Sequence, residues 1–363
     1  MSARLARFHD PLLRAAAVLA AALLLGACSA PQSRSLLRDW PSAAPDAMLL
    51  SAVPFHPQER FQCGPAALAT VLQHSGLAAT PTELIDEVYL PAREGSLQAE
   101  MIASARARGA LVYPLRPTLE ALIAELRAGN PVLVMQNLGL DWLPRWHYAV
   151  VIGYDRVQRE FVLRSGTLAE RRSDFSTFER TWARSGHWAL LVLPADRLPA
   201  SAEPLPYLRA VLALRESGDD VLGAFAAATR RWPRQPLTWL SLGNAQLGAG
   251  DPAAAARSYR RAAQVAAEPE STAADASMAE AAAEATAQAT TIERAALHAV
   301  AWNNYASALG ALGCGGAARA AVACALQAEP EREAFKATAE EVAGLAAGGG
   351  SCPPVADCRS AGD

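Results

Sequence analysis

The first candidate catalytic residue is Cys63, which lies where the sequence predicts the start of a helix. Pro65 suits the first turn of a helix, where no amide donor is needed, and apolar residues recur behind it at helical spacing. A thiol at a helix N-terminus meets unpaired amide N–H groups and the positive end of the helix dipole. We therefore expect Cys63 to be a nucleophile with a lowered pKa.

A cysteine nucleophile needs a base, and His147 is the candidate. It opens the strand-like run HYAVVIGY, whose later residues are nearly all apolar, so its ring is expected to face a cleft. His187 opens a similar run but lacks a motif around it, and we interpret it as a strand-edge residue. His74 lies eleven residues after Cys63, about 16 Å along a helix, which is too far for a base. His56 is left open as a supporting residue.

Together these segments resemble the papain-like peptidase domain of the double-glycine, bacteriocin-processing family of cysteine peptidases. The resemblance runs from Val53 to about Leu193 and rests on VPFHPQERFQCGPAALATVLQHSG, the helix after Thr82, EGSLQAEMIASARARGALVYPL, the Gly-Asn-Pro entry into a strand, and HYAVVIGYD. It implies that Cys63 attacks the scissile carbonyl, that His147 is the base and that Gln58 donates to the oxyanion. Gln58 precedes Cys63 by five residues, one fewer than in the transporter-borne members.

The aspartate that orients the histidine in this family has no counterpart here. In the family this aspartate follows the histidine by about sixteen residues. The corresponding stretch of this chain is VLRSG, which contains no aspartate. Asp155 is no substitute, because eight residues of strand place it some 26 Å from His147. If the hairpin turns near residues 157–158, Ser165 is the predicted hydrogen-bond partner of His147, with Asn137 as the alternative. A neutral partner stabilises an imidazolium less than a carboxylate does, so we expect activity to be reduced or to depend on substrate binding.

The N-terminal residues have the pattern of a targeting signal. Three arginines precede the apolar run from Ala15 to Leu25, which ends in Leu-Gly-Ala-Cys and resembles the lipobox of bacterial lipoproteins. The resemblance implies a signal peptide over residues 1–27 and acylation of Cys28. Ser29, in place of an aspartate, implies the outer membrane, with the protein facing the periplasm. The sequence has no other stretch long and apolar enough to span a bilayer, so we expect the lipid to be its one membrane anchor, followed by a tether over residues 28–50.

The mature chain is predicted to hold two domains. Residues 51–194 alternate helical and β-rich runs, which predicts an α+β, papain-like domain. A proline-rich linker over 195–206 leads to an all-α domain over 207–347, and residues 348–363 form a tail rich in glycine and cysteine.

The second domain carries a repeating pattern. A glycine follows an aromatic residue by eleven positions three times, and the last two units resemble the tetratricopeptide repeat. The aromatic and glycine positions are Tyr207 and Gly218, Trp239 and Gly250, and Trp302 and Gly313. A segment around Ala273 to Ile292 is predicted to be a helical insertion in this array. The alternative to the repeat array as a whole is an alanine-rich helical bundle without repeat geometry. A repeat array would present a concave surface to a peptide or protein.

Composition excludes several functions. The chain has 33 Lys+Arg against 36 Asp+Glu, a net charge of −3 and no long basic run, which argues against a nucleic-acid partner. It has no cysteine and histidine cluster with zinc spacing and no glycine-rich phosphate loop, so neither a metal nor a cofactor is predicted. After acylation of Cys28, four C-terminal cysteines can form two disulfides in any of three pairings, which leaves Cys63 free.

The sequence therefore predicts a lipid-anchored cysteine peptidase of the cell envelope that cleaves peptides or leader sequences, with helical repeats that bind the substrate or a protein partner. Two other functions stay open. One is a catalytically silent scaffold for an envelope complex, which the missing aspartate favours. The other is a cysteine-dependent amidase or acyltransferase, because the same pair of residues serves acyl transfer to other acceptors.

Overall fold

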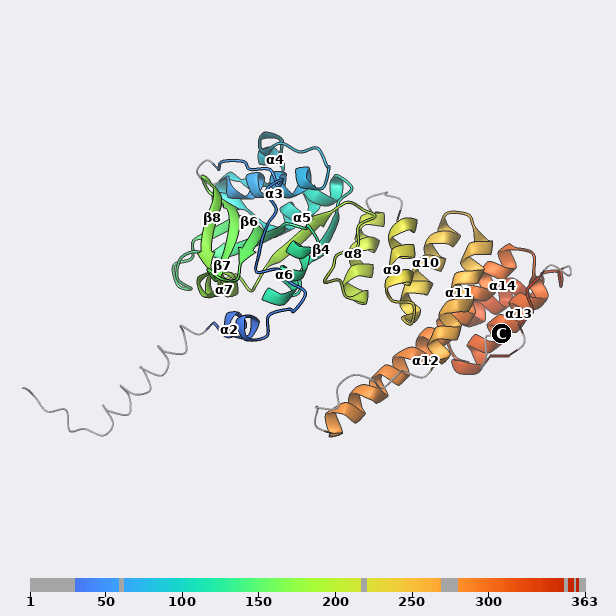
Figure 1. Ribbon diagram of the computed structural model, residues 1–363. Helices are drawn as coiled ribbons and strands as arrows, with labels where there is room; N and C mark the ends of the chain where they lie inside the picture. The colour runs from blue at the N-terminus through green and yellow to red at the C-terminus, as the bar shows by residue number, and fades with distance from the viewer. Residues whose placement is uncertain are drawn as a thin grey trace, which may run out of the picture. The chain divides into compact units, whose positions relative to one another are not determined.

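The computed structural model describes residues 30–58, 62–216, 221–268, 280–348, 352–355 and 357–358. The predicted signal peptide over residues 1–27 and the predicted lipidation site Cys28 lie outside the described residues. The chain divides into two compact units (Figure 1). The first comprises Met1–Pro194 with Pro199–Ser201, and the second comprises Ala195–Leu198 with Ala202–Asp363. Within the described ranges, no helix is long and apolar enough to cross a membrane.

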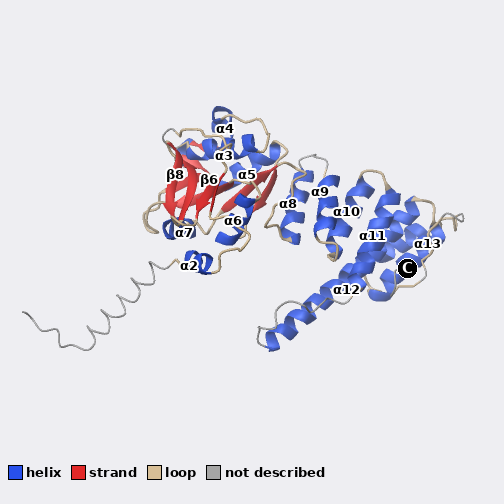
Figure 2. Ribbon diagram, viewed as in Figure 1, coloured by secondary structure: helices blue, strands red, loops and turns tan. Residues whose placement is uncertain are grey.

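The first unit is built on a seven-stranded antiparallel sheet, coloured red in Figure 2. Its strands run in the order β4-β9-β5-β6-β7-β8, and β1 also pairs with β6. The strands are β1 (Ala47–Leu49), β4 (Leu111–Pro114), β5 (Val132–Asn137), β6 (Trp146–Asp155), β7 (Glu160–Ser165), β8 (Leu168–Asp174) and β9 (Ala189–Leu193). A separate two-stranded sheet joins β2 (Tyr89–Leu90) to β3 (Gly95–Ser96).

Helices cover both faces of this sheet (Figure 1). One face carries α3 (Cys63–His74), with α4 (Pro81–Val88) and α5 (Gln98–Ala107) beside it; the 3-10 helix η1 (Pro91–Arg93) precedes β3. The other carries α6 (Leu119–Arg127) and α7 (Phe175–Ala183). Strand β6 lies between these layers and is buried on both sides, which explains its nearly continuous apolar sequence. The α+β class predicted for this region is confirmed.

The segment before Leu50 is folded, so the predicted tether over residues 28–50 is wrong for most of its length. Helix α2 (Pro31–Arg38) docks through Ser33, whose backbone N–H and hydroxyl both donate to the buried carboxylate of Glu179, at 2.7 and 2.6 Å. Strand β1 then pairs with β6, Met48 lying opposite Tyr154. These partners are more than a hundred residues away along the chain, so the local composition could not indicate them.

The hairpin that carries His147 has the predicted turn. Strands β6 and β7 pair from Asp155 opposite Glu160 to Val150 opposite Arg164, so the chain reverses near residues 157–158. Asp155 therefore lies at the far end of the hairpin from His147, as the strand arithmetic predicts.

The second unit is all-α, as predicted. Consecutive helices pack on one another: α8 (Pro204–Glu216), α9 (Leu222–Arg231), α10 (Pro236–Gly248), α11 (Pro252–Ala267), α12 (Glu280–Ala311), α13 (Gly315–Ala328) and α14 (Glu333–Ala343). Helix α8 begins inside the predicted linker over 195–206. Helix α12 confirms that the predicted segment is helical from residue 280 onward, and residues 269–279 lie outside the description. Gly243 admits the ring of Tyr259, because a Cβ there would come within 2.5 Å of it.

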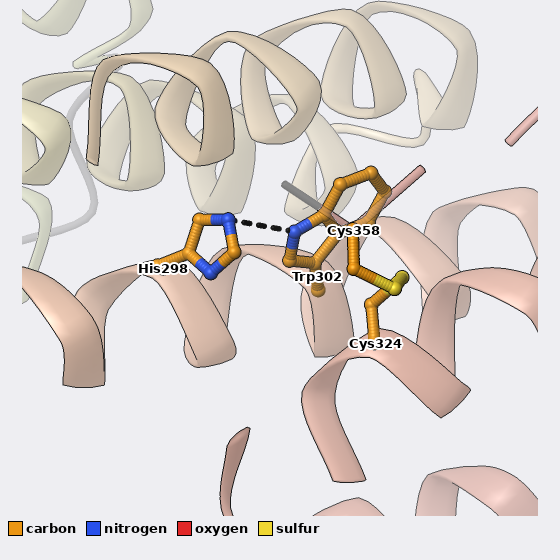
Figure 3. The surroundings of a disulfide bond; sticks show 4 residues. All are labelled: His298, Trp302, Cys324 and Cys358. Atoms are coloured by element: carbon orange, nitrogen blue, oxygen red, sulfur yellow. Dashed lines mark hydrogen bonds between the residues drawn. A yellow bond between two sulfur atoms is a disulfide. The ribbon is translucent and has the colours of Figure 1, made fainter. Parts of the chain in front are cut away.

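Two disulfides hold the C-terminal residues against this unit. Cys314 pairs with Cys352 and Cys324 with Cys358, which selects one of the three pairings that the sequence leaves open. Figure 3 shows the second bond beside Trp302, whose indole N–H donates to His298 at 3.0 Å. The described part of the predicted 348–363 tail is therefore attached to the helices rather than free.

Candidate active site

The thiol of Cys63 sits at the first residue of α3, where the helix packs against β6. Three backbone N–H groups favour its thiolate, those of Tyr148, Gly64 and Cys63 itself. Burial has the larger effect and raises the pKa of the Cys63 thiol above its ordinary value of 9.0. The expected lowering of this pKa is therefore wrong: packing the helix start onto the sheet removes more hydration than the amides replace.

The start of α3 lies in close contact with β3. A Cβ on Gly64 would lie 2.3 Å from the hydroxyl oxygen of Ser96, so this position accepts glycine only. The Tyr148 hydroxyl donates to the backbone carbonyl of Ser96 at 3.2 Å, which ties β3 to β6. The first turn of α3 thus lies against both β3 and β6.

His147 has the partner that the pairing arithmetic predicts. Its Nε2 lies 2.8 Å from the hydroxyl oxygen of Ser165, which is 2% exposed. Burial, followed by the positive charge of Arg171, lowers the pKa of His147 to about 4. The imidazole is therefore neutral at pH 7. If its proton is on Nε2 and is donated to Ser165, the lone pair on Nδ1 is left to accept another proton.

Asn137, the alternative partner, does something else. Its side-chain oxygen accepts from the backbone N–H groups of Gly139 and Arg145, both at 2.9 Å, and it shapes the connection between β5 and β6. Gln136, not Asn137, lies opposite His147 in the sheet, and its amide donates to Thr181. Of the two candidate partners, Ser165 is therefore the one that contacts the His147 ring.

Gln58 reaches the same end of the sheet through Gly166, the residue after Ser165. Its backbone N–H donates to the Gly166 carbonyl and its side-chain oxygen accepts from the Gly166 N–H, both at 3.1 Å. This pair of bonds fixes the amide and leaves its Nε2 without a partner among the described residues. Residues 59–61, between Gln58 and the cysteine segment, lie outside the description.

Arg164 occupies the stretch where the resemblance places an aspartate, and its role is structural. The guanidinium is buried and donates to the backbone carbonyls of Val53, Ser51 and Ala169. It therefore anchors the segment that leads to Gln58 and does not contact His147.

The structure brings together four predicted residues at one end of β6 and β7. Cys63 contacts the backbone of Tyr148, the residue after His147; His147 binds Ser165; and Gln58 binds the residue after Ser165. Three of the other histidines lie elsewhere. They are His56, bound to Gln73 near the other end of α3; His74, bound to the Gly129 carbonyl; and His187, packed on the ring of Trp182.

Sequence reasoning missed three contributors: the backbone N–H of Tyr148, the close contact of Ser96 and the charge of Arg171. A backbone donor has no residue-type signal, and the Ser96 contact depends on how β3 folds back. Arg171 stands in an exposed strand with another arginine beside it, which is typical of a solvated face. Among the described residues, no group of three or more metal-ligating side chains gathers here or elsewhere.

A partly buried cysteine at a helix start, a histidine on a neighbouring strand and a hydroxyl that holds the histidine define a cysteine-peptidase-like site on an α+β fold. Comparison with known proteins agrees with that class: residues 50–190 match the model of the Peptidase_C39 like family. This stretch is therefore similar to C39-like peptidases.

The chain also matches solved structures. One of these is the crystal structure of a candidate C39-like peptidase from Bacillus anthracis, with 20% sequence identity and a TM-score of 0.35. The match covers 41% of this chain and 98% of that one. No curated protein matches the chain.

Proposed function

We propose that this protein is a cysteine peptidase of the cell envelope, anchored by a lipid on Cys28, whose helical unit binds the peptide substrate or a protein partner. One observation carries the proposal: the Cys63 thiol contacts the backbone N–H of Tyr148, the residue after His147, and the His147 ring bonds to the Ser165 hydroxyl. The match to the C39-like family supports the same chemistry.

The reaction would begin with both groups neutral. His147, with Nε2 committed to Ser165, takes the thiol proton on Nδ1 as the sulfur attacks the scissile carbonyl carbon. The oxyanion accepts hydrogen bonds from the Cys63 N–H and from Nε2 of Gln58, which has no other partner among the described residues. The imidazolium then protonates the leaving amine, and a thioester remains on Cys63. Water then attacks the thioester and its proton passes to His147. The acid is released as the C–S bond breaks, and the proton returns from His147 to the Cys63 sulfur.

Peptide hydrolysis and thiol labelling by the full chain test this proposal. A mixed library of peptides is incubated with wild type, Cys63→Ala and His147→Gln, and the products are identified by mass spectrometry. We expect cleavage and labelling by a thiol-directed inhibitor to disappear in Cys63→Ala, and cleavage to fall at least a hundredfold in His147→Gln. His74→Gln is the matched control, because this histidine lies at the other end of α3. Unchanged cleavage in Cys63→Ala would refute the proposal.

A catalytically silent binding module is the second candidate. It is favoured by the raised pKa of the Cys63 thiol and by a neutral hydroxyl where the resemblance implies a carboxylate. An unreactive thiol at neutral pH, together with no product from any peptide, would support it. Adding amine acceptors to the same assay separates hydrolysis from acyl transfer, since a transferase would yield amide products.

The anchor is tested separately. Metabolic labelling with a fatty acid should mark the wild-type chain and not Cys28→Ser, and the labelled protein should fractionate with the outer membrane. A wild-type chain without label would contradict the anchor and leave the peptidase proposal standing.

A further inference from the structure

A basic cavity lies in the first unit, at the point where the described chain begins. It has a volume of about 400 Å³, and its walls come from α2, the turn between β6 and β7, and α7. Each of these three segments contributes one arginine to the lining: Arg34, Arg159 and Arg180. Among the described lining residues Asp174 is the only acidic one, so together they have a formal charge of +2.

Contacts between the three segments fix the arginines on one surface. Helices α2 and α7 lie side by side at one end of the sheet (Figure 1), and Ser33, next to Arg34, donates to the carboxylate of Glu179 on α7. The backbone N–H of the first residue of α7 donates to the Arg159 carbonyl at 2.7 Å. The side chains of Arg34 and Arg159 are exposed and have no partner among the described residues, so both guanidinium groups are available to a ligand.

The chain reaches this cavity directly from the predicted lipidation site. Ala30, the first described residue, lines the cavity and lies two residues after Cys28. Two residues of chain span at most about 7 Å, so a lipid on Cys28 would hold the cavity at the level of the headgroups. The phosphates at that level are anions that an arginine can bind through two parallel N–H···O bonds.

We propose that this cavity binds the phosphate of a phospholipid headgroup in the membrane that holds the anchor. The inference rests on the proposed lipid on Cys28 and adds an electrostatic contact beside it. Asp174 suits a zwitterionic headgroup, because its carboxylate can accept from the ammonium group of phosphatidylethanolamine.

This contact would direct the candidate active site away from the bilayer. Arg159 lies at the turn of the β6–β7 hairpin, and the pair of His147 and Ser165 lies at the opposite end of the same hairpin. Strand β6 spans about 26 Å between His147 and Asp155. A protein held at the headgroups by the hairpin turn would therefore present the His147 end to soluble peptides.

Vesicle sedimentation tests the proposal on a chain that carries no lipid. The chain from Ser29 onward, which keeps every described residue, is mixed with vesicles of phosphatidylethanolamine and phosphatidylglycerol. It is compared with Arg34→Gln/Arg159→Gln and with the control Arg93→Gln/Arg145→Gln, which removes the same charge from exposed positions outside the cavity. We expect the first double variant to bind about thirtyfold more weakly than wild type, and the control to bind as wild type does.

The outcomes separate this proposal from the anchor. Equal binding by all three chains, equal loss in both double variants, or no binding by wild type would each overturn it. Titration calorimetry with inorganic phosphate distinguishes a free anion: heat that depends on Arg34 and Arg159, with vesicle binding the same in all chains, would assign the cavity to a soluble phosphate instead. Fatty-acid labelling reports on Cys28 alone, so a chain without label whose vesicle binding still depends on the two arginines would refute the anchor and keep the headgroup site.

Discussion

The protonation states of the resting pair lead to a prediction about how Cys63 reacts with iodoacetamide as the pH changes. Burial raises the pKa of this thiol above 9.0 and lowers that of His147 to about 4. A thiol with a pKa of 9 is about 1% thiolate at pH 7, and Cys63 should hold less. Since the thiolate is the reacting form, its alkylation rate should rise about tenfold per pH unit from pH 6 to 8 and level off only above pH 9.

The assay is straightforward because Cys63 is the free cysteine among the described residues; the other described cysteines are in disulfides. Alkylation is followed by mass spectrometry of the peptide that contains Cys63, at several pH values, with Cys63→Ala as the blank. Substituting His147 by glutamine should leave the alkylation profile nearly unchanged, because a neutral imidazole adds no charge beside the sulfur. The same substitution should abolish most peptide cleavage, since transfer of the thiol proton needs the imidazole.

A different profile would refute this reasoning. A plateau in alkylation rate between pH 5 and 8 that disappears in the His147→Gln variant would mean a thiolate and imidazolium ion pair at rest. In that case the amides at the start of α3 and the imidazolium would outweigh desolvation, and the proton would move before substrate binds rather than during attack.

Three other predictions follow from single contacts. Ser165→Ala removes the hydroxyl that bonds Nε2 of His147 in a buried site and should lower kcat/KM about tenfold. Ser165→Thr keeps the hydroxyl and should restore most of the activity; equal loss in both variants would argue against the hydrogen bond. Folding lowers the pKa of His147 from 6.5 to about 4, so the folded state favours the neutral imidazole. The free energy of unfolding should therefore fall by up to about 3 kcal/mol as the pH is lowered from 6.5 to 4. Denaturant titrations at several pH values should show a smaller fall in His147→Gln. Replacing Cys324 and Cys358 by serine removes a bond that spans 34 residues and should lower the free energy of unfolding of the helical unit by about 3 to 4 kcal/mol, measured by denaturant unfolding followed by circular dichroism; an unchanged midpoint would contradict this.

Much of the site follows from local rules. The start of the helix at Cys63 is signalled by the proline two residues later, and the position of Ser165 follows from the length of the hairpin, because residues on paired strands have a fixed register. The length of the same strand excludes Asp155 as a partner of His147, because it lies at the far end of the hairpin. Asn137 lies on the strand beside that of His147, which makes it the alternative partner from the sequence. In the structure its side-chain oxygen instead accepts from the backbone N–H groups of the loop that follows it.

The sequence by itself determined which residues could act and how far along the chain they lie: a cysteine at a helix start, a histidine at a strand start, a hydroxyl opposite it and an α-helical second unit. Tertiary structure decided their chemical state. The packing of α3 against β6 raises the pKa of the thiol instead of lowering it, because desolvation depends on contacts between segments far apart in the sequence. Docking of residues 31–49 and the pairing of the four C-terminal cysteines were decided in the same way. Each depends on which distant groups come within bonding distance, and that information is held by the folded chain as a whole.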